Sequence, residues 1–205
     1  HSATVVGITG GGGAGKSSLV AALVGYLRGQ GRRVGVLAFD PQSPRSGGSL
    51  LGDRIRMTMD PEDNDVYFRS LSTGGATGGV GECAAESVQW MAAFGFDIVF
   101  VETVGFGQDQ VAVRDAVDVL VLVVTPLSGD EVQWEKAGLI ELADLIVVNK
   151  SDQPGADRVK EQLLQALNLA ADRPPVPVLA TTAISGTGIP QLWAAIASSA
   201  QTHST

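Results

Sequence analysis

The sequence predicts an α/β fold: a mostly parallel central sheet with helices on both faces. Two observations support this prediction. Apolar, β-branched runs alternate with amphipathic helical patterns from one end of the chain to the other. Most of these runs are continuously hydrophobic, which is typical of strands that are covered on both faces of a parallel sheet. The length of 205 residues suits one domain, so we expect a single domain over residues 1–205.

The apolar runs predict six strands, at 4–8, 34–39, 98–101, 119–124, 145–148 and 176–179. Between them, apolar residues at helical spacing predict helices joined to the strands by right-handed crossovers. One stripe has a four-residue period after Lys16 and a second lies before the last strand; their members are Leu19, Leu23, Leu27, Val159, Leu163 and Leu167. A third stripe holds Val80, Cys83, Val88 and Met91, and it predicts that Cys83 is a core residue.

Two segments show no periodicity. Residues 40–65 are rich in proline, glycine and charge, and residues 72–81 are rich in glycine. A long irregular stretch in a compact domain is usually a functional loop. We therefore expect both segments to be loops.

Composition excludes several functions. The chain has 14 basic and 22 acidic residues and no basic run longer than two, which argues against nucleic-acid binding. One cysteine excludes an internal disulfide framework and a cysteine-rich metal site. The longest aliphatic run, 119–124, falls far short of the roughly 20 apolar residues that span a bilayer. We expect a cytoplasmic protein with neither nucleic-acid nor membrane partners.

A phosphate-binding motif follows the first predicted strand. Residues 10–17, GGGGAGKS, fit G-x-x-x-x-G-K-[ST] between a strand and a helix. Glycines let backbone N–H groups converge on phosphate oxygens, and the helix N-terminus adds its positive dipole. Lys16 can reach the β- and γ-phosphates, and Ser17 can ligate Mg²⁺. This motif predicts a P-loop NTPase whose nucleotide contacts are Gly12, Gly13, Ala14, Gly15, Lys16, Ser17 and Ser18.

Polar residues follow the predicted strands, namely Asp40, Glu102, Thr125, Asn149 and Thr182. In an open parallel sheet, ligands bind outside the carboxyl ends of the strands. Asp40 and Glu102 are hard oxygen ligands near a phosphate loop, and they suit Mg²⁺. The alternative for both is helix capping or surface charge at a strand end.

Residues 102–105, ETVG, resemble the D-x-x-G loop of GTPases with Glu in place of Asp. Gly105 can donate its N–H to a γ-phosphate. Many GTPases place a water-orienting Gln at the next position, which here is Phe106. Intrinsic hydrolysis should therefore be slow, and a catalytic group has to come from elsewhere.

Residues 149–152, NKSD, have the N-K-x-D form of guanine recognition. Asp152 can accept hydrogen bonds from guanine N1–H and N2–H₂, donors that adenine lacks, and the stem of Lys150 can cover the base. Thr182 and Ala183 stand where GTPases turn a backbone N–H toward guanine O6, although a simple turn explains that pair about as well.

Five stretches together resemble one family, the G-protein chaperones of adenosylcobalamin-dependent acyl-CoA mutases (the MeaB, ArgK and MMAA group, and the G domain fused inside isobutyryl-CoA mutase). The stretches are 7–19, 39–57, 101–113, 129–144 and 149–152, of which SGGSLLGDRIRM at 46–57 is the most specific. The resemblance implies a Mg²⁺-dependent GTPase that binds GTP and GDP and is slow until a partner stimulates it. It also implies that the partner is an adenosylcobalamin-dependent acyl-CoA mutase, with the GTPase gating cofactor delivery or protecting the mutase.

The resemblance implies roles by position. Asp40 and Asp53 resemble carboxylates associated with Mg²⁺ at the first switch, 41–60, and Glu102 resembles that of the second switch, 102–113. Residues 128–141 resemble a third switch that relays the nucleotide state to the mutase, and Lys136 matches a lysine of stimulated hydrolysis. The implied catalytic residues are Lys16, Asp53, Glu102 and Lys136, and the implied metal ligands are Ser17, Asp40, Asp53 and Glu102.

Other functions stay open. Nickel-type metallochaperone GTPases share this fold class but depend on Cys and His ligands, and the histidines here are His1 and His203. A P-loop small-molecule kinase is a second alternative, and the guanine motif argues against it. A third is a binding module without turnover, because Phe106 cannot orient the attacking water. Longer family members dimerise through added helical segments. This chain ends after one final helix, which favours a short stand-alone chaperone and leaves a nucleotide-dependent homodimer as an alternative.

Overall fold

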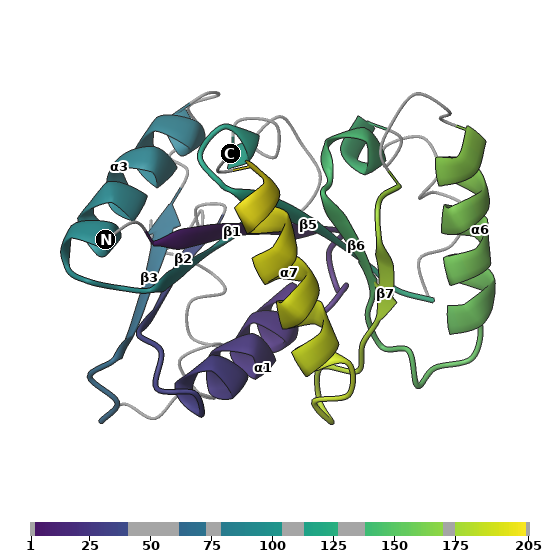
Figure 1. Cartoon of the computed structure of the whole chain (residues 1–205), viewed down its shortest axis with the longest axis horizontal. Coiled ribbons are helices and arrows are strands. Elements are labelled where there is room, and N and C mark those ends of the chain that lie inside the picture. Colours follow the sequence, from purple (N-terminus) through teal and green to yellow (C-terminus); the bar gives the residue numbers. More distant parts are fainter. Residues whose placement is uncertain are drawn as a thin grey trace, which may run out of the picture.

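A parallel sheet organises the protein, whose computed structural model describes residues 3–40, 62–72, 79–103, 113–126, 138–169 and 175–203. Within these residues seven strands form one sheet in the order β3-β2-β4-β1-β5-β6-β7, and every neighbouring pair is parallel (Figure 1). The strands are β1 (Thr4–Gly10), β2 (Val34–Asp40), β3 (Val66–Ser72), β4 (Ile98–Thr103), β5 (Val119–Val124), β6 (Leu145–Val148) and β7 (Val178–Ala180).

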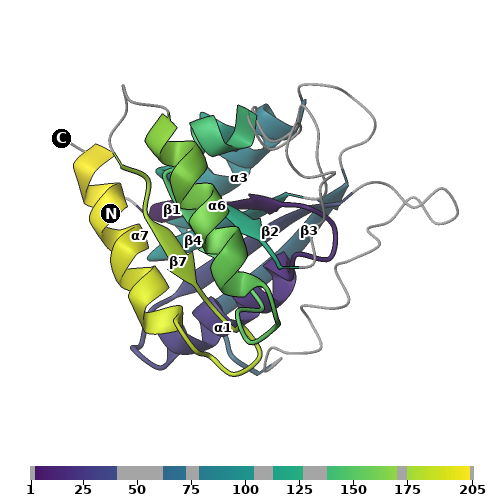
Figure 2. The same ribbon diagram turned by 90° about the vertical axis from the view of Figure 1, so that its right-hand side faces the viewer.

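Helices cover both faces of this sheet. They are α1 (Lys16–Arg28), α3 (Gly79–Ala93), α6 (Ala156–Leu169) and α7 (Ile189–His203), and residues 138–142 add one short helix. The helices α1 and α7 share one core cluster, which includes Leu23 and Leu192. The helices α3 and α6 pack in two other clusters with the strands. Figure 2 shows α6 and α7 on either side of β7. The fold class predicted from the sequence is therefore confirmed.

The central strand β1 carries the phosphate loop at its carboxyl end. β1 lies between β4 and β5, and it approaches β5 closely at Gly10. A Cβ at Gly10 would lie 2.2 Å from the carbonyl oxygen of Val123, and Gly10 has φ +145, so only glycine fits there. Because all the strands are parallel, the carboxyl ends of β4, β5, β6 and β7 reach the same edge as this loop.

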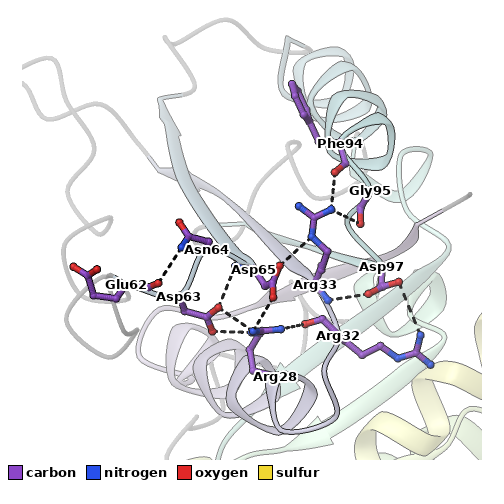
Figure 3. A network of polar contacts seen from close by, with 10 residues as sticks. All are labelled: Arg28, Arg32, Arg33, Glu62, Asp63, Asn64, Asp65, Phe94, Gly95 and Asp97. Carbon is purple, nitrogen blue, oxygen red and sulfur yellow. Dashed lines mark hydrogen bonds and ion pairs between the residues drawn. The ribbon is translucent and has the colours of Figure 1, made fainter.

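The amino edge of the sheet is tied together by charged side chains (Figure 3). Arg28, in the last turn of α1, forms two hydrogen bonds with the carboxylate of Asp63, at 2.7 and 2.9 Å, and one with Asp65 at 3.2 Å. Arg33 contacts Asp65 at 3.3 Å and donates to the carbonyl oxygens of Phe94 and Gly95. This network joins α1 to the starts of β2 and β3 and to the end of α3.

Three details differ from the sequence prediction. The strand β3 was not predicted, because it is an edge strand in which half-buried Val66 and Phe68 alternate with exposed Tyr67 and Arg69. The helix α3 begins at Gly79, so the predicted loop at 72–81 is too long. The prediction that Cys83 is a core residue is wrong, because its side chain is exposed.

The buried stripe of α3 keeps Val88 and Met91 of the predicted stripe and has Ala84 in place of Cys83. Ala84 lies four residues before Val88, which is helical spacing, whereas Cys83 lies five residues before it and is turned away by about 100°. No helix within the described part of the chain is long and apolar enough to cross a membrane.

Candidate nucleotide-binding site

The phosphate loop connects β1 to α1. It turns through a hydrogen bond from Ala14 N to Gly11 O at 3.2 Å, and it ends at Gly15, the N-cap of α1, with φ +84. No side chain of the described residues caps this helix, so its first N–H groups stay available to an anion. Gly12 and Gly13 are exposed, and Ser18 is exposed in the first turn of the helix. The loop thus has the shape and free donors of a phosphate cradle.

Lys16 is folded back onto this loop. Its ammonium group donates to the carbonyl oxygens of Gly10 and Gly11, at 2.9 and 3.0 Å. The residue is 7% exposed, and burial lowers the pKa of the ammonium, while the nearby Glu102 carboxylate partly opposes that shift. A phosphate group at the loop would give this buried cation a stronger anionic partner than two carbonyl oxygens.

Ser17 and Glu102 meet beside the loop, as the metal-site prediction requires. The Ser17 hydroxyl donates to Glu102 Oε1 at 2.7 Å, and Glu102 is buried. A hydroxyl and one carboxylate are donors that suit Mg²⁺, which uses few protein ligands and keeps phosphate oxygens and waters. Among the described residues no three or more of His, Cys, Asp and Glu gather as a metal centre.

Several predicted site residues lie outside the described part of the chain. They are Asp53, Gly105 and Lys136, together with the side chain of Asp40. Of the predicted switches, 41–60 lies outside the described residues entirely, 102–113 is described only at 102–103 and 113, and 128–141 is described only at 138–141. Those assignments remain predictions.

Asn149, at the end of β6, bridges the predicted base site and the phosphate loop. Its Nδ2 donates to Ala14 O at 3.0 Å, with Gly15 O at 3.5 Å. Its Oδ1 accepts from the Thr181 hydroxyl and from Ala183 N, both at 3.2 Å. The Asn149 amide therefore has partners on both of its sides, and it joins residues that are more than 130 positions apart.

Lys150 also reaches the phosphate loop. It adopts φ +58, the left-handed region that non-glycine residues seldom occupy, and its Nζ donates to Gly13 O at 2.8 Å. Its stem thus spans the space between the N-K-x-D segment and the glycines. This position is compatible with the predicted role of covering a base.

Asp152 stands at the exposed end of the same segment. Its Oδ1 accepts from the Thr182 hydroxyl at 3.3 Å, and the Thr182 and Ser151 hydroxyls are 3.1 Å apart. The structure thus brings Asn149, Asp152, Thr182 and Ala183 together at one edge of the sheet, beside the glycine loop.

Sequence reasoning missed Thr181, which is fully buried and contacts Asn149. It also missed the pair of buried hydroxyls on Thr9 and Thr103, 3.2 Å apart. Both threonines at the carboxyl ends of β1 and β4 lie next to predicted site residues, and a polar residue within an apolar strand end is the signal that could have revealed them.

The fold and the site define the class of this protein. A parallel sheet whose central strand runs into GGGGAGKS and an uncapped helix is the arrangement of a P-loop nucleoside-triphosphate-binding protein.

The family is shown by sequence comparison. The family model described as "Methylmalonyl Co-A mutase-associated GTPase MeaB" matches residues 1–205. The chain is 46% identical over 198 residues to a protein of Pyrococcus abyssi named as a GTPase. This alignment covers 93% of the chain and 60% of the Pyrococcus protein. It is 43% identical over 194 residues to the mitochondrial methylmalonic aciduria type A homolog of Mus musculus, covering 92% of the chain and 47% of that protein. The chain belongs to the MeaB family.

The chain spans about half to three fifths of the length of these two relatives. Solved structures agree on the fold. A LAO/AO transport system kinase superposes with TM-score 0.75 at 28% identity, over 100% of this chain and 62% of the other. HypB from Helicobacter pylori superposes with TM-score 0.69 at 15% identity, over 98% of this chain and 88% of the other, which is a likeness of fold alone.

Proposed function

We propose that this protein binds and hydrolyses GTP with Mg²⁺, and that it acts as a chaperone of an adenosylcobalamin-dependent acyl-CoA mutase by gating delivery of the cofactor or protecting the enzyme. Membership of a family described as mutase-associated GTPases supports the partner. A cytoplasmic location and a nucleotide-dependent homodimer belong to the same proposal.

One observation carries the nucleotide part of the proposal. Asn149, which belongs to the predicted guanine motif, donates to the main chain of the phosphate loop at Ala14 and accepts from Ala183 in the other predicted base loop. A nucleotide with its phosphates on the glycines would therefore place its base beside the guanine-type residues. Asp152 is exposed there and its carboxylate is available at the rim to guanine donors.

The reaction is phosphoryl transfer to water. Lys16 and the loop N–H groups would hold the β- and γ-phosphates in place. Ser17 and Glu102 would hold Mg²⁺, which when bound neutralises charge on the phosphate oxygens. Phe106 offers no group that can orient the attacking water, so rapid turnover needs a residue supplied on assembly with the partner. We propose Asp40 and Asp53 as further Mg²⁺-associated carboxylates, and Lys136 as the cation used in stimulated hydrolysis.

Calorimetry with GDP and ADP tests the nucleotide assignment. A site built for specific hydrogen bonds rejects an analogue that lacks them by about 10⁴-fold, so GDP should bind with at least that preference. Asp152→Asn should shift the preference from GDP toward xanthosine diphosphate, because an amide can donate to the xanthine oxygen that replaces the guanine amino group. Equal affinity of the parent for GDP and ADP would remove the GTPase proposal.

Co-purification tests the partner. The tagged protein should retain a cobalamin-dependent acyl-CoA mutase, and the added mutase should accelerate phosphate release. Retention of a urease or hydrogenase would instead support a nickel metallochaperone. One observation favours the alternative of a kinase, namely the 28% identity to a LAO/AO transport system kinase. Recovery of the γ-phosphate on an organic acceptor, rather than as inorganic phosphate, would support that alternative.

A further inference from the structure

Asn149 depends on neighbouring groups to hold its orientation. A primary amide can turn by 180° and exchange its donor and acceptor ends, so hydrogen-bond partners decide which way it points. On one side Nδ2 faces the carbonyl oxygens of Ala14 and Gly15, which need a donor. On the other side Oδ1 receives hydrogen bonds from Thr181 and Ala183.

The two donors to Oδ1 differ in what a nucleotide would do to them. Ala183 N–H lies in the loop expected to face guanine O6, so a bound base would compete with Asn149 for this group. The Thr181 hydroxyl is fully buried, 3.2 Å from Oδ1, so a base bound at the exposed rim would not compete for it. Thr181 is therefore the donor that can hold the amide in the liganded state.

A turn of this amide would disturb the phosphate loop. A Cβ built on Gly15 would come within 2.6 Å of Asn149 Nδ2, which shows how closely the amide packs on the N-cap of α1. Gly15 directly precedes Lys16 and Ser17. Any shift of Asn149 thus reaches the residues proposed to hold phosphate and metal.

We propose that Thr181 is a positioning residue for nucleotide binding, because its buried hydroxyl fixes the amide orientation of Asn149 and through it the relative placement of the base loop and the phosphate loop. The proposal deepens the proposed function, since it rests on a guanine nucleotide binding at this site. Thr181 touches no reacting atom, so its effect should appear in affinity rather than in the chemical step.

The test compares Thr181→Val, which keeps the shape and removes the hydroxyl, with Thr181→Ser, which keeps the hydroxyl. Thr187→Val is a matched control in the same loop, because Thr187 is exposed and its hydroxyl pairs with the hydroxyl of the exposed Ser185 at 2.8 Å. GDP affinity is measured by calorimetry on the full chain. Steady-state GTP hydrolysis gives KM and kcat.

Thr181→Val should weaken GDP binding about tenfold or more and raise KM, because Asn149 Oδ1 loses the hydroxyl that donates to it. Its kcat at saturating GTP should remain within about twofold of the parent, and Thr181→Ser and Thr187→Val should stay within about threefold in affinity. A damaged fold would instead lower kcat at unchanged KM, and that result would overturn the proposal.

GDP affinity of Thr181→Val within threefold of the parent would also overturn it, as would an equal loss in Thr181→Ser. Failure of the parent itself to prefer GDP over ADP would count against the proposed function, which keeps the two failures apart.

Discussion

The Ser17 hydroxyl and the Glu102 carboxylate are 2.7 Å apart beside the phosphate loop, and they make a sharp prediction for metal dependence. Glu102→Ala should raise the Mg²⁺ concentration needed for half-maximal GTP hydrolysis by about tenfold or more, the usual effect of losing a group that binds or orients a metal ligand. The measurement is a Mg²⁺ titration of phosphate release. Glu86→Ala, which removes an exposed carboxylate from α3, is the control. An unchanged Mg²⁺ requirement in Glu102→Ala would show that this carboxylate has no part in the metal site.

Gly10 makes a second prediction at the residue scale. A methyl group there would meet the Val123 carbonyl oxygen at 2.2 Å, in a backbone conformation that L-residues rarely adopt. Gly10→Ala should therefore lower the free energy of unfolding by about 3 kcal/mol or more. Gly25→Ala is the matched control, because Gly25 is an exposed position of α1 with open space around it, and alanine there should add about 0.5–1 kcal/mol. Urea unfolding measures both, and equal stability of the two variants would contradict the close approach of β1 to β5.

The site residues divide by the kind of signal they leave in a sequence. Lys16, Ser17, Asn149 and Asp152 belong to motifs with fixed spacing, so a strand and a helix on either side were enough to place them at one edge of the sheet. Thr181 has no motif, since its role comes from a hydrogen bond to a residue 32 positions away on a neighbouring strand end. Only tertiary structure brings such a pair together.

At the scale of elements, buried strands were predictable and the exposed edge was not. The runs in β5 and β6 are buried along their whole length, and continuous apolar sequence is what such burial demands. The edge strand β3 mixes half-buried and exposed residues and carries no such signature. Among the described side chains of α3 only Cys83 was misplaced, because the small residues Cys83, Ala84 and Ala85 follow one another there and composition does not decide which of them faces the core.

The charged network at the amino edge of the sheet predicts a pH dependence of stability. The hydrogen bond from Arg28 is the main cause that lowers the pKa of Asp63 from its ordinary value of 3.8. A carboxyl whose folded pKa is lowered stabilises the fold fully above its ordinary value, and this contribution is lost as the pH falls through the lowered folded value. Arg28→Ala should therefore be less stable than the parent at neutral pH, and the difference should shrink in acid below that value.

Urea unfolding at neutral and acidic pH measures this effect. Arg158→Ala, which removes an exposed arginine from α6, is the control and should match the parent at both values. A stability difference between Arg28→Ala and the parent that persists unchanged in strong acid would show that Arg28 acts through packing of its stem rather than through its charge.

At the scale of the whole molecule, the prediction concerns assembly with the mutase. Lys136→Ala should leave GTP affinity nearly unchanged and abolish most of the acceleration that the mutase produces, because a cation placed on the transferring phosphoryl group contributes about 10³-fold or more. Phosphate release with and without the mutase is the measurement, and Lys160→Ala on α6 serves as the lysine control. A Lys136→Ala protein that the mutase accelerates as strongly as the parent would remove this lysine from the mechanism.

The Asn149 amide has a consequence for how ligand fragments bind. The Asn149 side chain contacts both the loop that faces the base and the loop that faces the phosphates. A ligand that orders this side chain from one loop therefore lowers the conformational-entropy cost of binding a second ligand at the other loop. Guanosine should then tighten the binding of pyrophosphate, and thermodynamic linkage requires pyrophosphate to tighten the binding of guanosine by the same factor. Guanosine and pyrophosphate, the two fragments of the nucleotide, should therefore bind cooperatively even though no covalent bond joins them.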